Sequence, residues 1–92
     1  EEVKQYLQQL LGWQVTKEEH LNKLRKTYFF KEYKAAVAFV NRVAEAADEH
    51  DHHPVIVLEW GRVTISWWTH VLRGLHLNDF VMSANCEQLE HA

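Results

Sequence analysis

The sequence is poor in the residues that cross-link or interrupt a chain. Its 92 residues include one cysteine, Cys86, one proline, Pro54, and three glycines. A single cysteine excludes an internal disulfide framework and is typical of a reducing compartment, so we expect a cytoplasmic protein, with the nucleus as a second location. Because the chain has no low-complexity segment and no linker, we expect a single domain over residues 1–92.

Long basic runs and long apolar runs are also missing. The 13 acidic and 10 basic residues are mixed along the chain and give a net charge of -3. No run of lysine or arginine could follow a phosphate backbone, so we expect no direct nucleic-acid binding. No apolar stretch approaches the ~18 residues of a membrane span, and no basic and apolar leader opens the sequence, so we expect no membrane association. A leader that was trimmed away stays an open alternative, because the sequence does not begin with Met.

Hydrophobic periodicity predicts the elements of the fold. A short N-terminal helix begins near Val3 and ends at Gly12, the longest helix covers residues 31–49, and a last helix covers residues 77–90. Strands are expected over residues 13–16, 24–31, 55–60 and 62–69. The order β-β-α-β-β-α predicts an α+β protein, with a four-stranded antiparallel sheet and helices packed on one face.

The same periodicity predicts how these elements pack. The near-continuous apolar content of residues 55–60 and 62–69 favours strands that are covered on both faces in places. The last helix should contact the core through Phe80, Val81, Ala84 and Leu89. In the long helix the predicted apolar stripe consists of Tyr33, Ala36, Val37, Val40, Val43, Ala44 and Ala47.

Histidines and aspartates around the predicted hairpin form the most informative motif. Imidazole can donate and accept protons near neutrality, because its unperturbed pKa is about 6.5. Pro54 favours an extended conformation at His53 and so holds the adjacent histidines at the entrance of a strand. Neighbouring side chains on an extended chain point to opposite sides, so His52 and His53 can face one point only if the chain turns there. The motif reads Asp48-x3-His52-His53-Pro54-x5-Trp60-x9-His70-x8-Asp79.

Over residues 13–88 the chain resembles the pterin-4a-carbinolamine dehydratases. The resemblance implies the α+β order given above and the removal of water from 4a-hydroxytetrahydrobiopterin, which gives quinonoid dihydropterin in tetrahydrobiopterin recycling. It also implies that no metal or organic cofactor is needed. The residues that carry it are Phe30-Lys31-Glu32-Tyr33, Asp48, His52-His53-Pro54, Trp60, Thr69-His70, Gly74-Leu75 and Asp79, in this order.

The resemblance further implies a site for this chemistry. Expelling the 4a-hydroxyl requires a proton on that oxygen, while a ring nitrogen must lose one. His52, His53 and His70 would be the acid-base residues, and which of them donates stays open. Asp79 would orient a histidine or stabilise its charge, because a carboxylate favours protonated imidazole. The remaining candidates, for substrate binding, are Trp13, Pro54, Trp60 and Thr69.

Simpler interpretations exist for several of these residues. A His-His-Pro segment on its own is more often a surface turn than a catalytic pair, and Asp79 suits the first turn of a helix through the helix dipole. Three histidines and an aspartate can bind zinc, with Cys86 as a further ligand, but no H-x3-H or C-x2-C spacing is present, so we expect no metal. The other histidines are expected to be solvated, namely His20, His50, His76 and His91.

Several positions depart from the family pattern. Val55 and Val71 stand where relatives frequently carry an acidic residue, and Arg73 stands where the residue is usually small. Trp67 and Trp68 replace less bulky residues, and on a strand these neighbours should face opposite sides. The departures leave the candidate acid-base groups in place but bear on the shape of the pocket and on the surface for assembly.

The expected partners are a pterin substrate and further copies of the chain. Symmetric pairing would bury an exposed strand edge and apolar helix faces, and the resemblance implies a homodimer or homotetramer. The alternative function is a non-enzymatic interaction module, because some relatives act as dimerisation cofactors of a homeodomain transcription factor through helical surfaces. Histidines packed against one another, without a cavity of ligand size, would favour that alternative.

Overall fold

The computed structural model describes residues 10, 12–18, 20–69 and 75–90. They form four strands and two helices in the order β-β-α-β-β-α, which confirms the predicted α+β fold. The predicted N-terminal helix lies outside the described residues, except for Leu10 and Gly12. The elements are β1 (Gln14–Glu18), β2 (Leu21–Phe29), α2 (Tyr33–Glu49), β3 (Val55–Glu59), β4 (Arg62–Trp67) and α3 (Leu77–Glu90).

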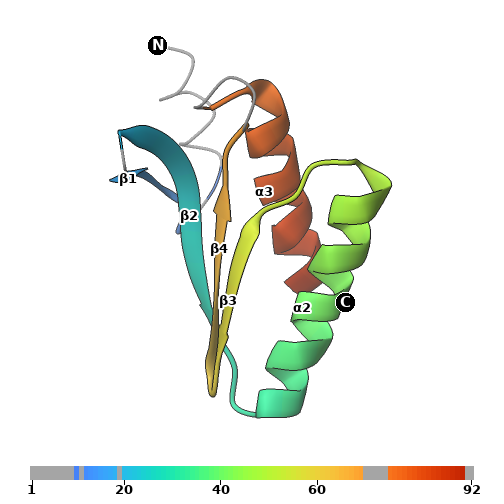
Figure 1. Ribbon diagram of the computed structural model, residues 1–92. Coiled ribbons are helices and arrows are strands. Elements are labelled where there is room, and N and C mark those ends of the chain that lie inside the picture. The colour runs from blue at the N-terminus through green and yellow to red at the C-terminus, as the bar shows by residue number, and fades with distance from the viewer. Residues whose placement is uncertain (1–9, 11, 19, 70–74, 91–92) are drawn as a thin grey trace.

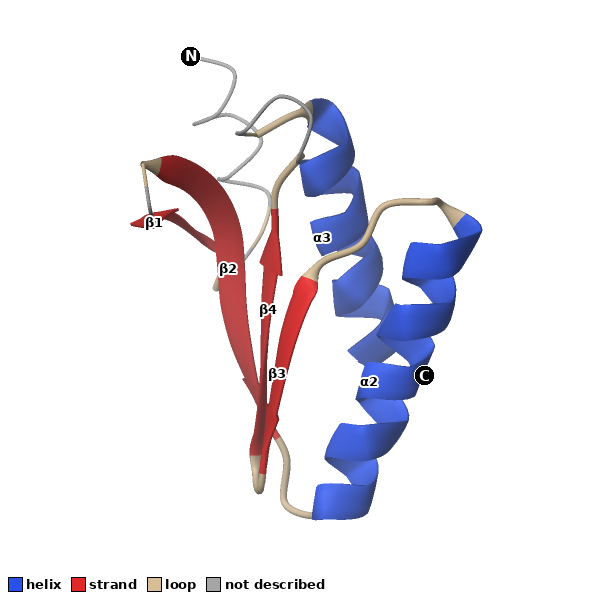
Figure 2. Cartoon of the chain, viewed as in Figure 1, coloured by secondary structure: helices blue, strands red, loops and turns tan. Residues whose placement is uncertain are grey.

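The strands form one antiparallel sheet in the order β1-β2-β4-β3. Both helices cover the same face of this sheet, as Figure 1 and Figure 2 show. The end of α2 and the beginning of α3 lie at one end of the molecule, whereas the turn between β3 and β4 lies at the other (Figure 1). The loop that carries the paired histidines is therefore brought next to the start of the last helix.

The register of the sheet places one set of alternate side chains against the helices. Leu24 lies opposite Trp67 and Tyr28 lies opposite Val63, and all four are buried. We expected the strands of residues 55–69 to be covered on both faces in places. β4 is covered in this way, whereas β3 is at the edge of the sheet and leaves its outward side chains, including Val55, exposed.

The predicted apolar stripe of α2 is partly wrong. Ala36, Val43 and Ala47 are buried as expected, but Tyr33 is 54% exposed. The centre of the face is Phe39, which the prediction omitted, and its ring packs 4.8 Å from that of Tyr28. The buried positions of α2 recur at intervals of three and four residues, as on one face of a helix. Tyr33 is the first residue of the helix and precedes the first buried position, Ala36.

The buried face of α3 is also rotated relative to the prediction. Phe80 is buried as expected, whereas Val81 and Ala84 are exposed. The core is filled instead by Met82, Ser83 and Cys86, and Leu89 is partly buried. This rotation brings Asp79 inside, which turns a charged residue of the first helical turn toward the sheet.

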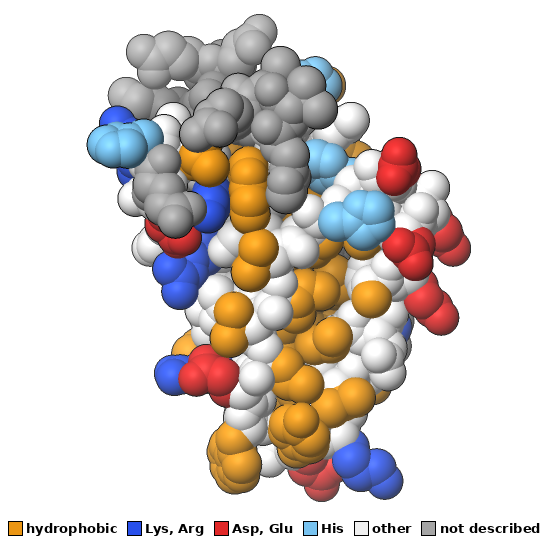
Figure 3. All heavy atoms as spheres, in the orientation of Figure 1, with side chains coloured by type: hydrophobic (Ala, Val, Ile, Leu, Met, Phe, Trp, Pro, Cys, Tyr) orange, Lys and Arg blue, Asp and Glu red, His pale blue; other side chains and the backbone are white. Residues whose placement is uncertain are grey.

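Strand ends differ from their predicted positions by a few residues. β2 begins three residues earlier than expected, at Leu21, and β4 ends at Trp67. No helix among the described residues is both long enough and apolar enough to cross a membrane. On the surface drawn in Figure 3, apolar side chains fill the space between the sheet and α2, and histidines gather toward the end where α2 finishes.

Candidate active site

The C-terminus of α2 positions His52 by its backbone. Asp51 adopts a left-handed conformation with φ 51°, which reverses the chain after the helix. The amide of Asp51 donates to the carbonyl of Asp48 at 3.2 Å, and the amide of His52 donates to that of Ala47 at 3.0 Å. These two bonds form a Schellman motif, which satisfies the last helical carbonyls. The turn sends His52 back toward the helical layer.

Asp79 is positioned by the first turn of α3. Its Oδ2 accepts a hydrogen bond from the backbone amide of His76 at 2.8 Å, while the Nδ1 of His76 accepts from the amide of Asn78 at 3.2 Å. This reciprocal arrangement resembles a capping box. The helix-start interpretation of Asp79 is therefore confirmed, and the helix dipole favours a negative charge there. The same carboxylate also has contacts outside its own helix.

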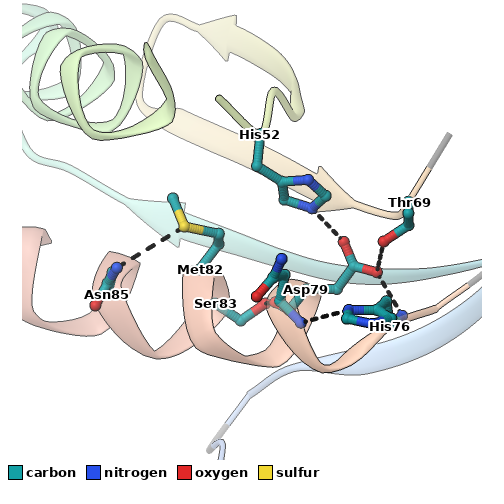
Figure 4. Close-up of polar contacts among 8 residues, drawn as sticks. His52, Thr69, His76, Asp79, Met82, Ser83 and Asn85 are labelled. Atoms are coloured by element: carbon teal, nitrogen blue, oxygen red, sulfur yellow. Dashed lines mark hydrogen bonds and ion pairs between the residues drawn. The ribbon is translucent and has the colours of Figure 1, made fainter. Parts of the chain in front are cut away.

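His52 and Asp79 form a close and shielded pair. Nε2 of His52 lies 2.6 Å from Oδ1 of Asp79, and the two side chains are 14% and 0% exposed. The hydroxyl of Thr69 donates to Oδ2 of Asp79 at 2.9 Å. Figure 4 shows His52, from the loop after α2, and Thr69, from the segment after β4, converging on the carboxylate of Asp79 at the start of α3. Such a carboxylate fixes the orientation of the imidazole ring.

A hollow of about 230 Å³ lies beside this pair. Its described lining consists of His50, His52, Asn78, Val81 and Met82. The volume is somewhat below the range of about 300–1,000 Å³ typical of small-molecule sites. One wall carries a histidine that is held by a buried carboxylate, and the rest is mostly neutral. A small ligand in the hollow would meet an imidazole able to exchange a proton.

His53 has a different environment from its neighbour. Its Nε2 lies 3.0 Å from Oδ1 of Asp48, and the two side chains are 58% and 82% exposed. Solvent and salt weaken a pair of this kind. The structure does not direct both histidines to one carboxylate, because the turn sends His52 inward and leaves His53 at the surface. Pro54 follows and is half-buried just before β3.

Two of the predicted substrate-binding residues lie elsewhere. Trp60 is 79% exposed in the turn between β3 and β4, at the opposite end of the sheet from His52. There it lines a separate surface hollow with Phe29 and Arg62. Trp13 is buried, and its indole N–H donates to Glu87 at 3.0 Å. His70 lies outside the described residues. Thr69 reaches the pair directly, as a donor to Asp79.

Glu87 forms a second polar cluster, two turns along α3. Lys26 donates to both of its carboxylate oxygens, at 2.8 and 3.0 Å, and the Tyr28 hydroxyl and the Trp13 indole also donate to it. Burial raises the pKa of the Tyr28 hydroxyl, and its bond to Glu87 raises it further. Burial acts to raise the pKa of Glu87, but these donors outweigh it and lower the pKa. The cluster links α3 to β2 through the contacts of Glu87 with Lys26 and Tyr28.

The described residues include no group of three His, Cys, Asp or Glu side chains arranged to hold a metal ion. Cys86, the candidate sulfur ligand, is buried in the core, and burial raises the pKa of its thiol to about 12. Among the other histidines, His20, His50 and His76 are exposed as predicted, and His91 lies outside the described residues.

One residue at the site was not among the predicted site residues. The indole of Trp67 lies parallel to the imidazole of His52, with ring centroids 5.6 Å apart and an angle of 6° between the planes. Trp68 is on the other face of the sheet, where the ammonium of Lys23 lies 4.1 Å from its ring centre. The predicted alternation of the two tryptophans is therefore confirmed. The alternation of side chains along a strand could have predicted that Trp67 faces the helices, but not that it contacts His52.

Comparison with known proteins gives the same family throughout. The family model described as pterin 4 alpha carbinolamine dehydratase matches residues 1–89. A protein of Vibrio cholerae serotype O1 is 47% identical over 89 residues, which are 97% of this chain and 82% of that protein. A protein of Chlorobium limicola is 49% identical over 84 residues, which are 91% and 74% of the two chains. Both carry the name "Putative pterin-4-alpha-carbinolamine dehydratase".

Two solved structures share the fold. The crystal structure of a transcriptional coactivator/pterin dehydratase from Brucella melitensis has a TM-score of 0.87 at 27% identity, covering 97% of this chain and 93% of that one. A pterin dehydratase-like protein, identified as a RuBisCO assembly factor in the alpha-carboxysome, has a TM-score of 0.72 at 21% identity over 86% and 89% of the chains. The second likeness concerns the fold alone. Because the family model and the relatives span nearly its whole length, the chain belongs to the pterin-4a-carbinolamine dehydratase family.

Proposed function

We propose that this protein dehydrates 4a-hydroxytetrahydrobiopterin to quinonoid dihydropterin and water, in the recycling of tetrahydrobiopterin. Membership of the family supports the reaction class. The observation that carries the proposal is the pair of His52 and Asp79, 2.6 Å apart beside a hollow. A histidine that served only to fill the core would need neither a fully buried carboxylate as partner nor contact with an open hollow. A cytoplasmic location is proposed as well, because a single cysteine, Cys86, is typical of proteins in a reducing compartment.

His52 is the proposed general acid. In its charged form both ring nitrogens are donors, so Nε2 can remain bonded to Asp79 while Nδ1 delivers a proton to the 4a-hydroxyl. The C–O bond then breaks, and the hydroxyl leaves as water with the delivered proton. Asp79 keeps the imidazole charged and oriented until that step. The hydrogen bonds from Thr69 and from the His76 amide hold the carboxylate itself in place.

His53 is the proposed base, which takes the proton from the pterin ring nitrogen as the C=N bond forms. Its exposed side chain and its exposed partner Asp48 support this assignment, because a weakly held imidazole exchanges protons readily with solvent. His70 remains a predicted third member of the site. Pro54 and Thr69 remain candidates to border the substrate. Trp13 and Trp60 remain weaker candidates, because Trp13 is buried beside Glu87 and Trp60 lies in the turn between β3 and β4.

The direct test follows turnover of 4a-hydroxytetrahydropterin by absorbance with the purified protein. We expect activity in the wild type and a loss of about 10²–10⁴-fold in His52→Gln, because a positioned acid is removed. His20→Gln, which changes an exposed histidine of the turn between β1 and β2, is the matched control and should keep full activity. An inactive wild type, or an active His52→Gln variant, would contradict the proposal.

Assembly into a homodimer or homotetramer is also proposed. It is supported by the position of β3 at the edge of the sheet and by the exposed apolar side chains Val55 and Val57 on that strand, which a second copy could cover. Light scattering at micromolar concentration should give a multiple of the monomer mass. A monomer would contradict this part of the proposal and leave the dehydratase function standing.

A transcription-factor partner is the second candidate function. The Brucella melitensis structure, which is described as a coactivator as well as a dehydratase, favours it. This role would use surface residues and would not depend on His52. A pull-down with the dimerisation segment of a homeodomain transcription factor should therefore give equal recovery of wild type and His52→Gln, and no recovery of either would exclude the role.

A further inference from the structure

Trp67 has an environment that core packing alone does not explain. It is fully buried, yet the acceptor that faces its indole N–H among the described residues is the thiol of Cys86, which accepts only weakly. A buried donor that is paired so weakly costs free energy, which an aliphatic side chain of the core would avoid. The face of the Trp67 indole also lies against the imidazole of His52.

That face completes the support of the imidazole. Asp79 holds Nε2 at one edge of the His52 ring, which fixes the ring in its own plane but leaves rotation about the hydrogen bond open. Trp67 lies parallel to the ring, at 6° and 5.6 Å between centroids, within the range of stacked aromatic pairs. An edge contact and a face contact together leave the imidazole one orientation. The indole face also attracts a positive charge placed over it.

We propose that Trp67 is a positioning residue, whose indole holds the His52 ring in the plane in which Nε2 meets Asp79. Its effect on rate rests on the proposed dehydratase function, whereas the contact between the two rings does not. Among the described residues, the titratable groups that face His52 are Asp79, from the start of α3, and His50, across the hollow. Only Asp79 is close enough to be paired, so Trp67 and Asp79 would act together on one cation.

Tryptophan emission tests the contact without any substrate, because a protonated imidazole in contact with an indole quenches its fluorescence. Four proteins are compared at acidic pH: wild type, His52→Gln, Trp67→Phe and the double variant. Replacing His52 should raise the emission when Trp67 is present and should leave it unchanged when Trp67 is already phenylalanine. Trp68→Phe is the matched control, because the Trp68 indole is on the opposite face of the sheet. Replacing His52 in the Trp68→Phe protein should therefore raise the emission as it does in the wild type.

Kinetics test the consequence. Trp67→Leu should lower kcat by about threefold to thirtyfold, the range expected for one cation–aromatic contact, with KM nearly unchanged, and Trp67→Phe should recover part of the loss. Circular dichroism checks folding, and Trp67→Phe with His52→Gln carries the test if Trp67→Leu does not fold. Emission that rises equally without Trp67, or does not respond to His52→Gln, would overturn the proposal. If the protein lacks dehydratase activity altogether, the emission cycle still decides it.

Discussion

Two adjacent histidines in this protein each have an aspartate partner, and the two pairs differ in almost every physical respect. His52 and Asp79 are shielded from solvent and 2.6 Å apart, whereas His53 and Asp48 are largely exposed and 3.0 Å apart. The first carboxylate has two further donors and lies at a helix N-terminus. The carboxylate of Asp48 has one described contact, with His53, and this contact is exposed to solvent. The comparison teaches that adjacent residues of one type can form pairs of very different strength, because the burial of each pair decides its strength.

The largest difference between the pairs should follow removal of each carboxylate charge. Asp79→Asn keeps the shape but removes the charge that holds His52, so we expect kcat/KM for dehydration to fall by ~10²-fold or more. The alkaline limb of the pH–rate profile should move to lower pH, because the imidazolium loses its stabilising partner. Steady-state kinetics over pH measure both effects. An unchanged profile would reduce Asp79 to a helix-capping residue.

The turn that separates the two histidines gives the next largest effect. A left-handed conformation costs a residue with a side chain roughly 1–2 kcal/mol, and a β-branched residue more. Asp51→Gly should therefore raise the free energy of unfolding by up to about 1 kcal/mol, while Asp51→Val should lower it and reduce turnover by displacing His52. Thermal unfolding and turnover of the two variants form a matched pair. Equal effects of Gly and Val would show that the turn does not position the histidine.

The Glu87 cluster should affect stability and leave the chemistry alone. The pKa of Glu87 is lower in the folded protein, because its donors outweigh burial, so its contribution is present above the unfolded pKa of about 4.5 and is lost as pH falls below it. Glu87→Gln should cost about 1 kcal/mol or less near neutrality, since the pair with Lys26 is partly exposed and screened. Denaturant unfolding at several pH values should show a flatter acid limb, with turnover retained. A loss of turnover as large as that of Asp79→Asn would contradict the separation of the two clusters.

The smallest effect is expected at the exposed pair. Asp48→Asn should change the free energy of unfolding by only a few tenths of a kcal/mol and turnover by less than about twofold, because an exposed pair is worth little. His53→Gln tests the base on its own and should lower turnover much more than Asp48→Asn does. If both variants behave as wild type, His53 is not part of the acid-base pair.

The sequence predicted much of the fold because the signals were local. The near-continuous apolar content around β4 and the helical periodicity of α2 predicted these two elements. The order of elements then left few ways to build the sheet. The errors concern faces. Phe39 was missed and Val81 was misplaced, because which side of a helix meets the sheet depends on packing at a distance.

The site was predicted to the level of residue types and a family pattern, but not to the level of partners. Asp79 was expected to orient one of the histidines, without a statement of which one, and in the structure it pairs with His52. The parallel contact of Trp67 with His52 could not be predicted, because it joins a strand to a loop whose path is set by the left-handed Asp51. The predicted grouping of Trp60 with the histidines does not occur within the chain, because β3 separates them along its length.

A double-mutant cycle tests the central claim, that His52 and Asp79 act as one functional unit. Turnover of 4a-hydroxytetrahydropterin is measured for wild type, His52→Gln, Asp79→Asn and the double variant, with folding checked by circular dichroism. If the two residues act together, the double variant should be no slower than His52→Gln alone, since Asp79 acts through that histidine. Losses that multiply in the double variant would show that the two residues act independently and would contradict the account.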